Sequence, residues 1–162
     1  MNAEAKWHGG AAETRANLLI ADDDMVCRIA LSSQLEPWFH VVAVAESATE
    51  AIELAEKHRP DIALVDVQMP GGGAREAVPG IATSSPDTRI VVLSSDESTR
   101  DVLELLDAGA IAYMRKGATV AEIAKTLTTA LEVTPHQRQG RTMPRSPSLA
   151  GGAASGAGGG AS

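Results

Sequence analysis

Short continuous runs of apolar residues alternate along this chain with longer segments whose apolar residues recur at helical spacing. The runs are built mainly from Val, Ile, Leu and Ala, and apolar positions do not alternate with polar ones within them. Continuous runs of this kind are typical of strands buried on both faces of a parallel sheet. The sequence therefore predicts five short strands, at 18–21, 41–45, 62–65, 90–93 and 110–114.

The segments between and after these runs predict helices. Apolar residues recur at three- and four-residue spacing in 48–55, 74–81, 102–106 and 120–131, and a shorter pattern around Val26, Ile29 and Ala30 marks a helix after the first strand. Five strand–helix units imply right-handed crossovers and helices on both faces of the sheet. We therefore predict an α/β fold with a doubly wound, five-stranded parallel sheet.

One local feature conflicts with this pattern. Pro79 and Gly80 fall inside the third predicted helix, where an interior proline costs about 3 kcal/mol. Because the apolar spacing continues to Ile81, we expect a kinked or short helix there.

Composition and charge divide the chain into a domain at 17–133, an N-terminal tail at 1–16 and a C-terminal segment at 134–162. The domain holds 19 Asp/Glu against 9 Lys/Arg, a net charge of −10, so we expect no direct binding to nucleic acid. The C-terminal segment is rich in Pro and Arg and then in Gly, Ala and Ser, which predicts a disordered tail or linker. No apolar run reaches the roughly 18 residues of a membrane span, and we expect a cytoplasmic protein.

Polar residues gather where the predicted strands end. Asp22, Asp23 and Asp24 follow the first strand, Asp66 follows the third, Ser94 and Ser95 follow the fourth, and Lys116 lies beyond the fifth. Ligand sites of doubly wound sheets lie outside the carboxyl ends of the strands. We therefore expect carboxylates, a hydroxyl and an ammonium to converge at one edge, with Asp24 capping the first helix.

This set of groups indicates a particular chemistry. Crowded carboxylates repel one another, and a bound dication relieves the repulsion. Hard oxygen ligands suit Mg²⁺, which completes its coordination with waters and phosphate oxygens. A metal-bound carboxylate next to a lysine can attack phosphorus and form an aspartyl phosphate, and the hydroxyl and the ammonium can then donate to the phosphoryl oxygens.

The segments LLIADDD, DIALVDVQMP, RIVVLSS and GAIAYMRKG resemble the receiver domain of two-component response regulators over residues 17–133. The resemblance implies a flavodoxin-like strand order 2-1-3-4-5 and makes Asp66 the phospho-acceptor. It implies that Asp23, Asp66 and the main-chain carbonyl of Gln68 bind Mg²⁺ directly, while Asp22 acts through water.

The same resemblance makes Lys116 the phosphate-contacting lysine, and Ser94 and Tyr113 the residues that switch the face formed by helix 4, strand 5 and helix 5. Gly117 departs from the family pattern, because many receivers carry a proline there. The implied phosphoryl donor is a histidine kinase or a phosphotransfer protein, and the implied role is a non-enzymatic phosphorelay switch.

Several alternatives stay open at this point. The domain can stand alone, regulate a DNA-binding or cyclic-nucleotide output domain of a longer protein, or form a phosphorylation-dependent homodimer. A receiver that only binds a partner, and a phosphohydrolase that turns over an aspartyl phosphate, are the rivals from other classes. Gln68 argues against turnover, because such enzymes usually carry an acid/base aspartate two residues after the nucleophile.

Overall fold

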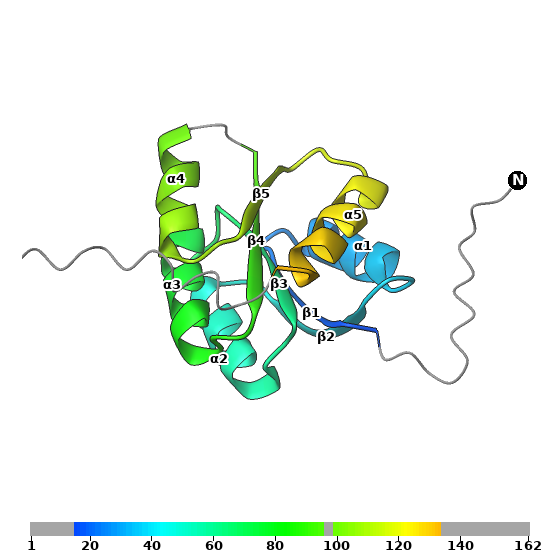
Figure 1. Ribbon diagram of the computed structural model, residues 1–162, viewed down its shortest axis with the longest axis horizontal. Coiled ribbons are helices and arrows are strands. Elements are labelled where there is room, and N and C mark those ends of the chain that lie inside the picture. The colour runs from blue at the N-terminus through cyan, green and yellow to red at the C-terminus, as the bar shows by residue number, and fades with distance from the viewer. Residues whose placement is uncertain (1–14, 96–98, 134–162) are drawn as a thin grey trace, which may run out of the picture.

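The computed structural model describes residues 15–95 and 99–133, and within them strands and helices alternate (Figure 1). The strands are β1 (Asn17–Ala21), β2 (His40–Ala45), β3 (Ile62–Asp66), β4 (Arg89–Ser94) and β5 (Ala112–Arg115). The helices are α1 (Met25–Leu35), α2 (Ala48–His58), α3 (Ala74–Ser84), α4 (Thr99–Ala108) and α5 (Val120–Leu131). The predicted tails lie outside the described residues, apart from Arg15 and Ala16.

All strand pairs are parallel, and the strand order is β2-β1-β3-β4-β5. This order confirms the predicted doubly wound sheet. Helices α1 and α5 cover one face, and α2, α3 and α4 cover the other (Figure 1). Every residue of the central strand β3 is buried, which explains why its sequence is continuously apolar up to its last residue, Asp66.

Side-chain caps fix the start of three helices on the described part of the chain. Asp24 accepts hydrogen bonds from the main-chain N–H groups of Val26 and Cys27, as predicted for the start of α1. Ser47 caps α2, and Thr119 forms a reciprocal capping box with Glu122 at the start of α5. These caps set where the loops at the carboxyl ends of the strands stop.

Two features of the helices could not be read from the spacing of apolar residues. Val26 and Ile29 lie on the solvent side of α1, with exposed fractions of 71% and 60%, so they are not part of its buried face. Helix α3 is not short, since it runs for 11 residues with Pro79 inside it. Buried residues on both sides of the proline keep it packed, and packing outweighs the helix-breaking tendency of one residue.

None of the helices in the described part of the chain is long and apolar enough to cross a membrane.

Candidate functional site

The predicted site residues meet at the carboxyl edge of the sheet. Asp22 follows β1, and Asp66 and Ser94 are the last residues of β3 and β4. Lys116 comes directly after β5, and its main-chain N–H donates to the Ser94 carbonyl at 2.8 Å. Because all five strands are parallel, these ends lie side by side. The structure therefore brings together the groups that the sequence placed at four separate strand ends.

Three carboxylates crowd this edge. Oxygen atoms of Asp22, Asp23 and Asp66 all lie within 4.8 Å of one another. Asp22 and Asp66 are only 1% and 3% exposed, whereas Asp23 faces solvent. Two buried negative charges at this separation repel strongly, because the surrounding protein screens them less than water does. The cluster therefore needs cations to hold it.

Lys116 supplies the first of these cations. Its ammonium donates a hydrogen bond to Asp66 Oδ2 at 2.8 Å and lies 3.3 Å from Asp22 Oδ2. Partial burial by itself lowers the pKa of Lys116, but the hydrogen bond and the two negative charges outweigh burial and raise its pKa. The lysine is therefore firmly positive and bridges two of the acidic residues.

The Asp66 carboxyl is buried, and its surroundings disfavour its charged form. Burial raises its pKa, and the neighbouring charge of Asp22 adds to the rise, while the hydrogen bond from Lys116 works against both. The main-chain N–H of Gln68 adds a long contact of 3.4 Å to Oδ1. An anionic Asp66 is thus costly here without an additional cation, and such a group is a candidate for reaction.

Asp22 supports a cation site in another way. Its Oδ1 accepts the main-chain N–H of Asp24 at 2.9 Å, but its fully buried Oδ2 has no hydrogen-bond partner and only the 3.3 Å ion pair with Lys116. A buried oxygen without a donor is unusual. Hard carboxylate oxygens with spare acceptor capacity are suitable ligands for Mg²⁺, so the residues present fit this ion.

Ser94 and Tyr113 lie on the same face of the sheet. Ser94 is buried, and it stands two residues after Val92, which pairs with Tyr113 in the register of β4 and β5. Since side chains alternate along a strand, both residues point to the face covered by α2, α3 and α4. Their role as the switch residues stays a prediction.

A turn of three glycines follows the site residues on β3. Gly71, Gly72 and Gly73 all have positive φ, at 81°, 96° and 61°. A Cβ at Gly73 would lie 2.2 Å from the main-chain oxygen of Val67, so only glycine fits there. The turn leads back to the sheet, where the Ala74 N–H donates to that same oxygen at 3.1 Å.

One further residue, Arg28, lies at the site although the sequence pattern did not indicate it. Arg28 reaches from α1 to the acidic loop, and its Nη1 donates to the main-chain oxygen of Asp22 at 2.7 Å. A basic residue one turn into the helix after an acidic run was the available signal. Its contact with a carbonyl rather than a carboxylate depends on a side-chain conformation that spacing alone does not reveal.

The sequence of this chain is similar to those of response regulators. Residues 18–128 match the family model described as "Response regulator receiver domain". The chain is 35% identical over 112 residues to the response regulator GacA of Pseudomonas viridiflava, covering 68% of this chain and 52% of that protein. It is 39% identical over 108 residues to the transcriptional regulatory protein PdtaR of Mycobacterium tuberculosis, covering 65% of this chain and 52% of that protein.

Among solved structures, the signal receiver domain of the putative response regulator NarL from Mycobacterium tuberculosis is similar, with a TM-score of 0.69 and 26% identity. The match covers 72% of this chain and 96% of that one. The chain spans about half the length of the curated relatives it matches.

Proposed function

Because the chain belongs to the response regulator receiver domain family, we propose that it is a Mg²⁺-dependent switch whose phosphoryl acceptor is Asp66. The observation that carries this proposal is the environment of the Asp66 carboxylate. It is buried at the end of the central strand, bound by Lys116 at 2.8 Å, and grouped with two further carboxylates.

In the proposed reaction, a carboxylate oxygen of Asp66 attacks the phosphorus of a phosphohistidine on a histidine kinase or a phosphotransfer protein. The new P–O bond forms as the P–N bond breaks, and the departing imidazole takes a proton from solvent. The ammonium of Lys116 already touches Asp66 Oδ2, so a small movement lets it donate to the transferred phosphoryl oxygens. The Ser94 hydroxyl is the second donor.

We assign the metal to Asp23, Asp66 and the main-chain carbonyl of Gln68, with Asp22 acting through water. When bound, Mg²⁺ supplies positive charge that offsets both the carboxylates and the incoming phosphoryl oxygens. The protein contributes an edge of hard oxygen ligands that lie within 4.8 Å of one another. The buried Asp22 Oδ2, which has no hydrogen bond and pairs with the Lys116 ammonium at 3.3 Å, would be the acceptor for a metal-bound water.

We propose that the domain stores the phosphoryl group and does not turn over a substrate. A phosphohydrolase needs an acid/base group near the nucleophile, and the residue two positions after Asp66 is Gln68, which has no carboxylate. Steady phosphate release from small phosphomonoesters would overturn this part of the proposal.

The proposed output follows from the placement of Ser94 and Tyr113 on the face that α4 covers. Movement of Ser94 towards the phosphoryl group leaves space for Tyr113, which changes the packing of the surface formed by α4, β5 and α5. The curated relatives are named as response and transcriptional regulators, which supports a role in controlling an output domain or a separate target. A phosphorylation-dependent homodimer stays a prediction.

The test is Mg²⁺-dependent labelling by acetyl phosphate, followed as a mobility shift on a phosphate-binding gel. Asp66→Asn should lose the label, because its amide cannot attack phosphorus. Asp24→Asn keeps a capping oxygen at the start of α1 and should label like the wild type. Unchanged labelling of Asp66→Asn would show that the acceptor lies elsewhere.

A further inference from the structure

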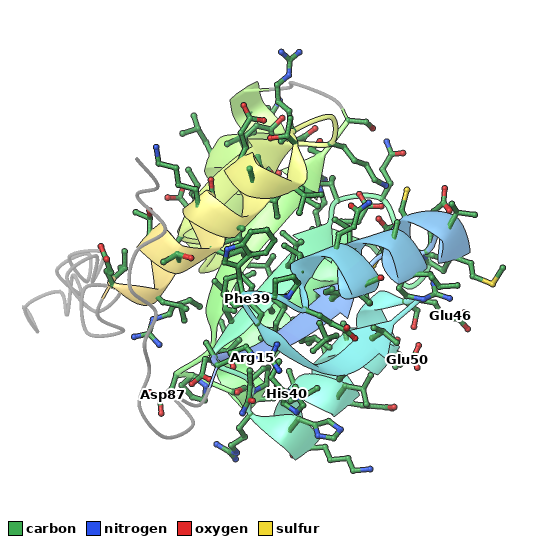
Figure 2. The ribbon with its side chains drawn as sticks, turned by 90° about the vertical axis from the view of Figure 1, so that its right-hand side faces the viewer. Arg15, Phe39, His40, Glu46, Glu50 and Asp87 are labelled. Carbon is green, nitrogen blue, oxygen red and sulfur yellow. The ribbon has the colours of Figure 1, made fainter. Side chains whose placement is uncertain are left out.

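The side chain of Arg28 ties α1 to two loops at the carboxyl edge of the sheet. Only 15% of this side chain is exposed. Its Nη1 donates to the main-chain oxygen of Asp22 at 2.7 Å, and its Nη2 lies 3.8 Å from Glu46 Oε2. Glu46 follows β2, and Figure 2 shows it at the end of the sheet opposite to Arg15 and His40. We infer that Arg28 is a positioning residue that sets the geometry of the metal-binding loop.

Besides its ion pair with Lys116, Asp22 is held by three hydrogen bonds, and Arg28 provides one of them. Its N–H donates to the Ala45 carbonyl at 3.0 Å, and its Oδ1 accepts from the Asp24 N–H at 2.9 Å. The third hydrogen bond joins Arg28 to the Asp22 carbonyl. That carbonyl belongs to the planar peptide group that also contains the nitrogen of Asp23. Fixing the Asp22 carbonyl therefore fixes where the chain enters Asp23, which the proposed function makes a direct metal ligand.

An arginine suits this task better than a lysine. One terminal nitrogen of Arg28 donates a hydrogen bond to the loop after β1, and the other forms a weaker ion pair at 3.8 Å with the exposed Glu46, the residue after β2. A guanidinium holds its donors in a rigid plane, whereas an ammonium is a single point charge on a flexible stem. Lysine at this position keeps the charge but loses the fixed two-sided contact.

Positioning and charge make opposite predictions about the metal, and this makes the inference testable. If Arg28 only placed a positive charge near the carboxylates, removing that charge would strengthen the binding of a dication. If Arg28 positions the loop, its loss weakens metal binding even though a repulsive charge has gone. Residues that orient metal ligands typically change affinity by about 10- to 100-fold when mutated.

The experiment measures Mg²⁺ binding to the full chain by calorimetry for the wild type, Arg28→Lys and Arg28→Gln. Both Arg28 variants should raise the dissociation constant by about tenfold or more. Arg100→Gln removes one exposed cation from α4 and serves as the matched control, with affinity unchanged. Tighter binding by Arg28→Gln, or unchanged binding by both Arg28 variants, would overturn the inference.

A second measurement needs no metal. In the metal-free protein, hydrogen exchange at the Asp24 N–H reports on the loop, because this group donates to Asp22 Oδ1. Exchange there should be about tenfold faster in both Arg28 variants, while the Ser85 N–H, which donates to the Ile81 carbonyl at 2.8 Å, should be unaffected and shows that the fold is intact.

The two measurements separate this inference from the proposed function on which it rests. If the wild type binds Mg²⁺ but neither the affinity nor the Asp24 exchange rate responds to Arg28, only the positioning role fails. If the wild type binds no Mg²⁺ and Asp24 exchange still accelerates in the variants, the loop contact stands and the metal site fails. If the wild type binds no Mg²⁺ and Asp24 exchange does not respond to Arg28, both the metal site and the positioning role fail.

Discussion

Replacing Gly73 by alanine tests whether the turn after β3 holds the acceptor end of that strand in place. Gly73 has φ 61° and ψ −150°, a combination that is strained for any residue with a side chain. An added Cβ would lie 2.2 Å from the main-chain oxygen of Val67, the residue after Asp66. Since a Cβ cannot rotate away and its neighbour is a main-chain oxygen, the turn itself must move to relieve the clash.

The expected loss of stability combines several contributions. The unfavourable backbone conformation costs about 1–3 kcal/mol, and loss of the hydrogen bond from the Ala74 N–H to the Val67 carbonyl costs about 0.5–1.5 kcal/mol. Alanine recovers about 0.4–1 kcal/mol by restricting the unfolded chain. With the steric clash included, Gly73→Ala should lower the free energy of unfolding by about 2–4 kcal/mol.

The two preceding glycines offer matched controls. Gly71 also has positive φ, but a Cβ there would lie 3.4 Å from its nearest neighbour, Thr49 Oγ1, which is ordinary contact. A Cβ at Gly72 would lie 2.1 Å from Cγ and 3.1 Å from Cβ of Glu76, and the exposed Glu76 side chain can turn its Cγ away but not its Cβ. Gly71→Ala should therefore cost only about 1 kcal/mol, from the left-handed backbone alone, and Gly72→Ala should fall between Gly71→Ala and Gly73→Ala.

Urea denaturation of the three alanine variants gives the free energies of unfolding, and acetyl phosphate labelling of the folded proteins gives the effect on the site. Gly73→Ala should be the least stable variant and the slowest to label, because the displaced Val67 lies between Asp66 and Gln68. The reasoning would be refuted if Gly73→Ala matched Gly71→Ala in stability to within about 0.5 kcal/mol.

Two further predictions concern stability. The raised pKa of Asp66 means that its stabilising contribution is present below the ordinary aspartate pKa of about 3.9 and is lost as pH rises through the higher folded-state value. Metal-free Asp66→Asn should therefore be more stable than the wild type at pH 7 but not near pH 4, by thermal denaturation, and a less stable variant at pH 7 would contradict this. A Cβ at Gly80 would lie 2.3 Å from Ile52 Cδ1, so Gly80→Ala overpacks this contact between α3 and α2. The overpacking outweighs the gain in helix propensity from alanine, and the free energy of unfolding should fall by up to about 2 kcal/mol. In an Ile52→Ala background, which removes both Cδ1 and the Cγ1 that would lie 2.6 Å away, the same change should become neutral or stabilising, and an equal effect in both backgrounds would exclude the contact as its cause.

The sheet and the site were predictable from the sequence for one physical reason. Strands buried on both faces must be continuously apolar, so their ends are visible as the positions where charge begins. Parallel strands place all such ends at one edge, which is how Asp22 and Asp66, 44 positions apart in the chain, could be expected to meet. Lys116 followed by the same rule, and it lies 2.8 Å from Asp66.

The spacing of apolar residues was least informative where tertiary packing decides. Helical spacing identifies an apolar stripe but not the direction in which it points, and Val26 and Ile29 turned out to face solvent. Pro79 removes a helical hydrogen bond, yet α3 continues past it with Val78 and Ile81 both fully buried. The close approach of Gly80 to Ile52 shows how tightly α3 packs against α2, and spacing along one helix carries no information about its neighbour.

Helix α4 is the element best suited to respond to a change at the site. Among its described side chains, Leu105 alone is buried, whereas α3 buries four residues. Besides the packing of Leu105 in the core, α4 is joined to α3 by an exposed ion-pair group in which Arg75 Nη2 lies 2.6 Å from Asp101 Oδ1 and 3.3 Å from Glu104 Oε2. Exposed pairs of this kind contribute only about 0.2–1 kcal/mol each, so α4 has less buried contact to lose than the helix beside it. A phosphoryl group that rearranged Ser94 and Tyr113 would therefore shift α4 at small cost while β3 and α3 keep the acceptor fixed.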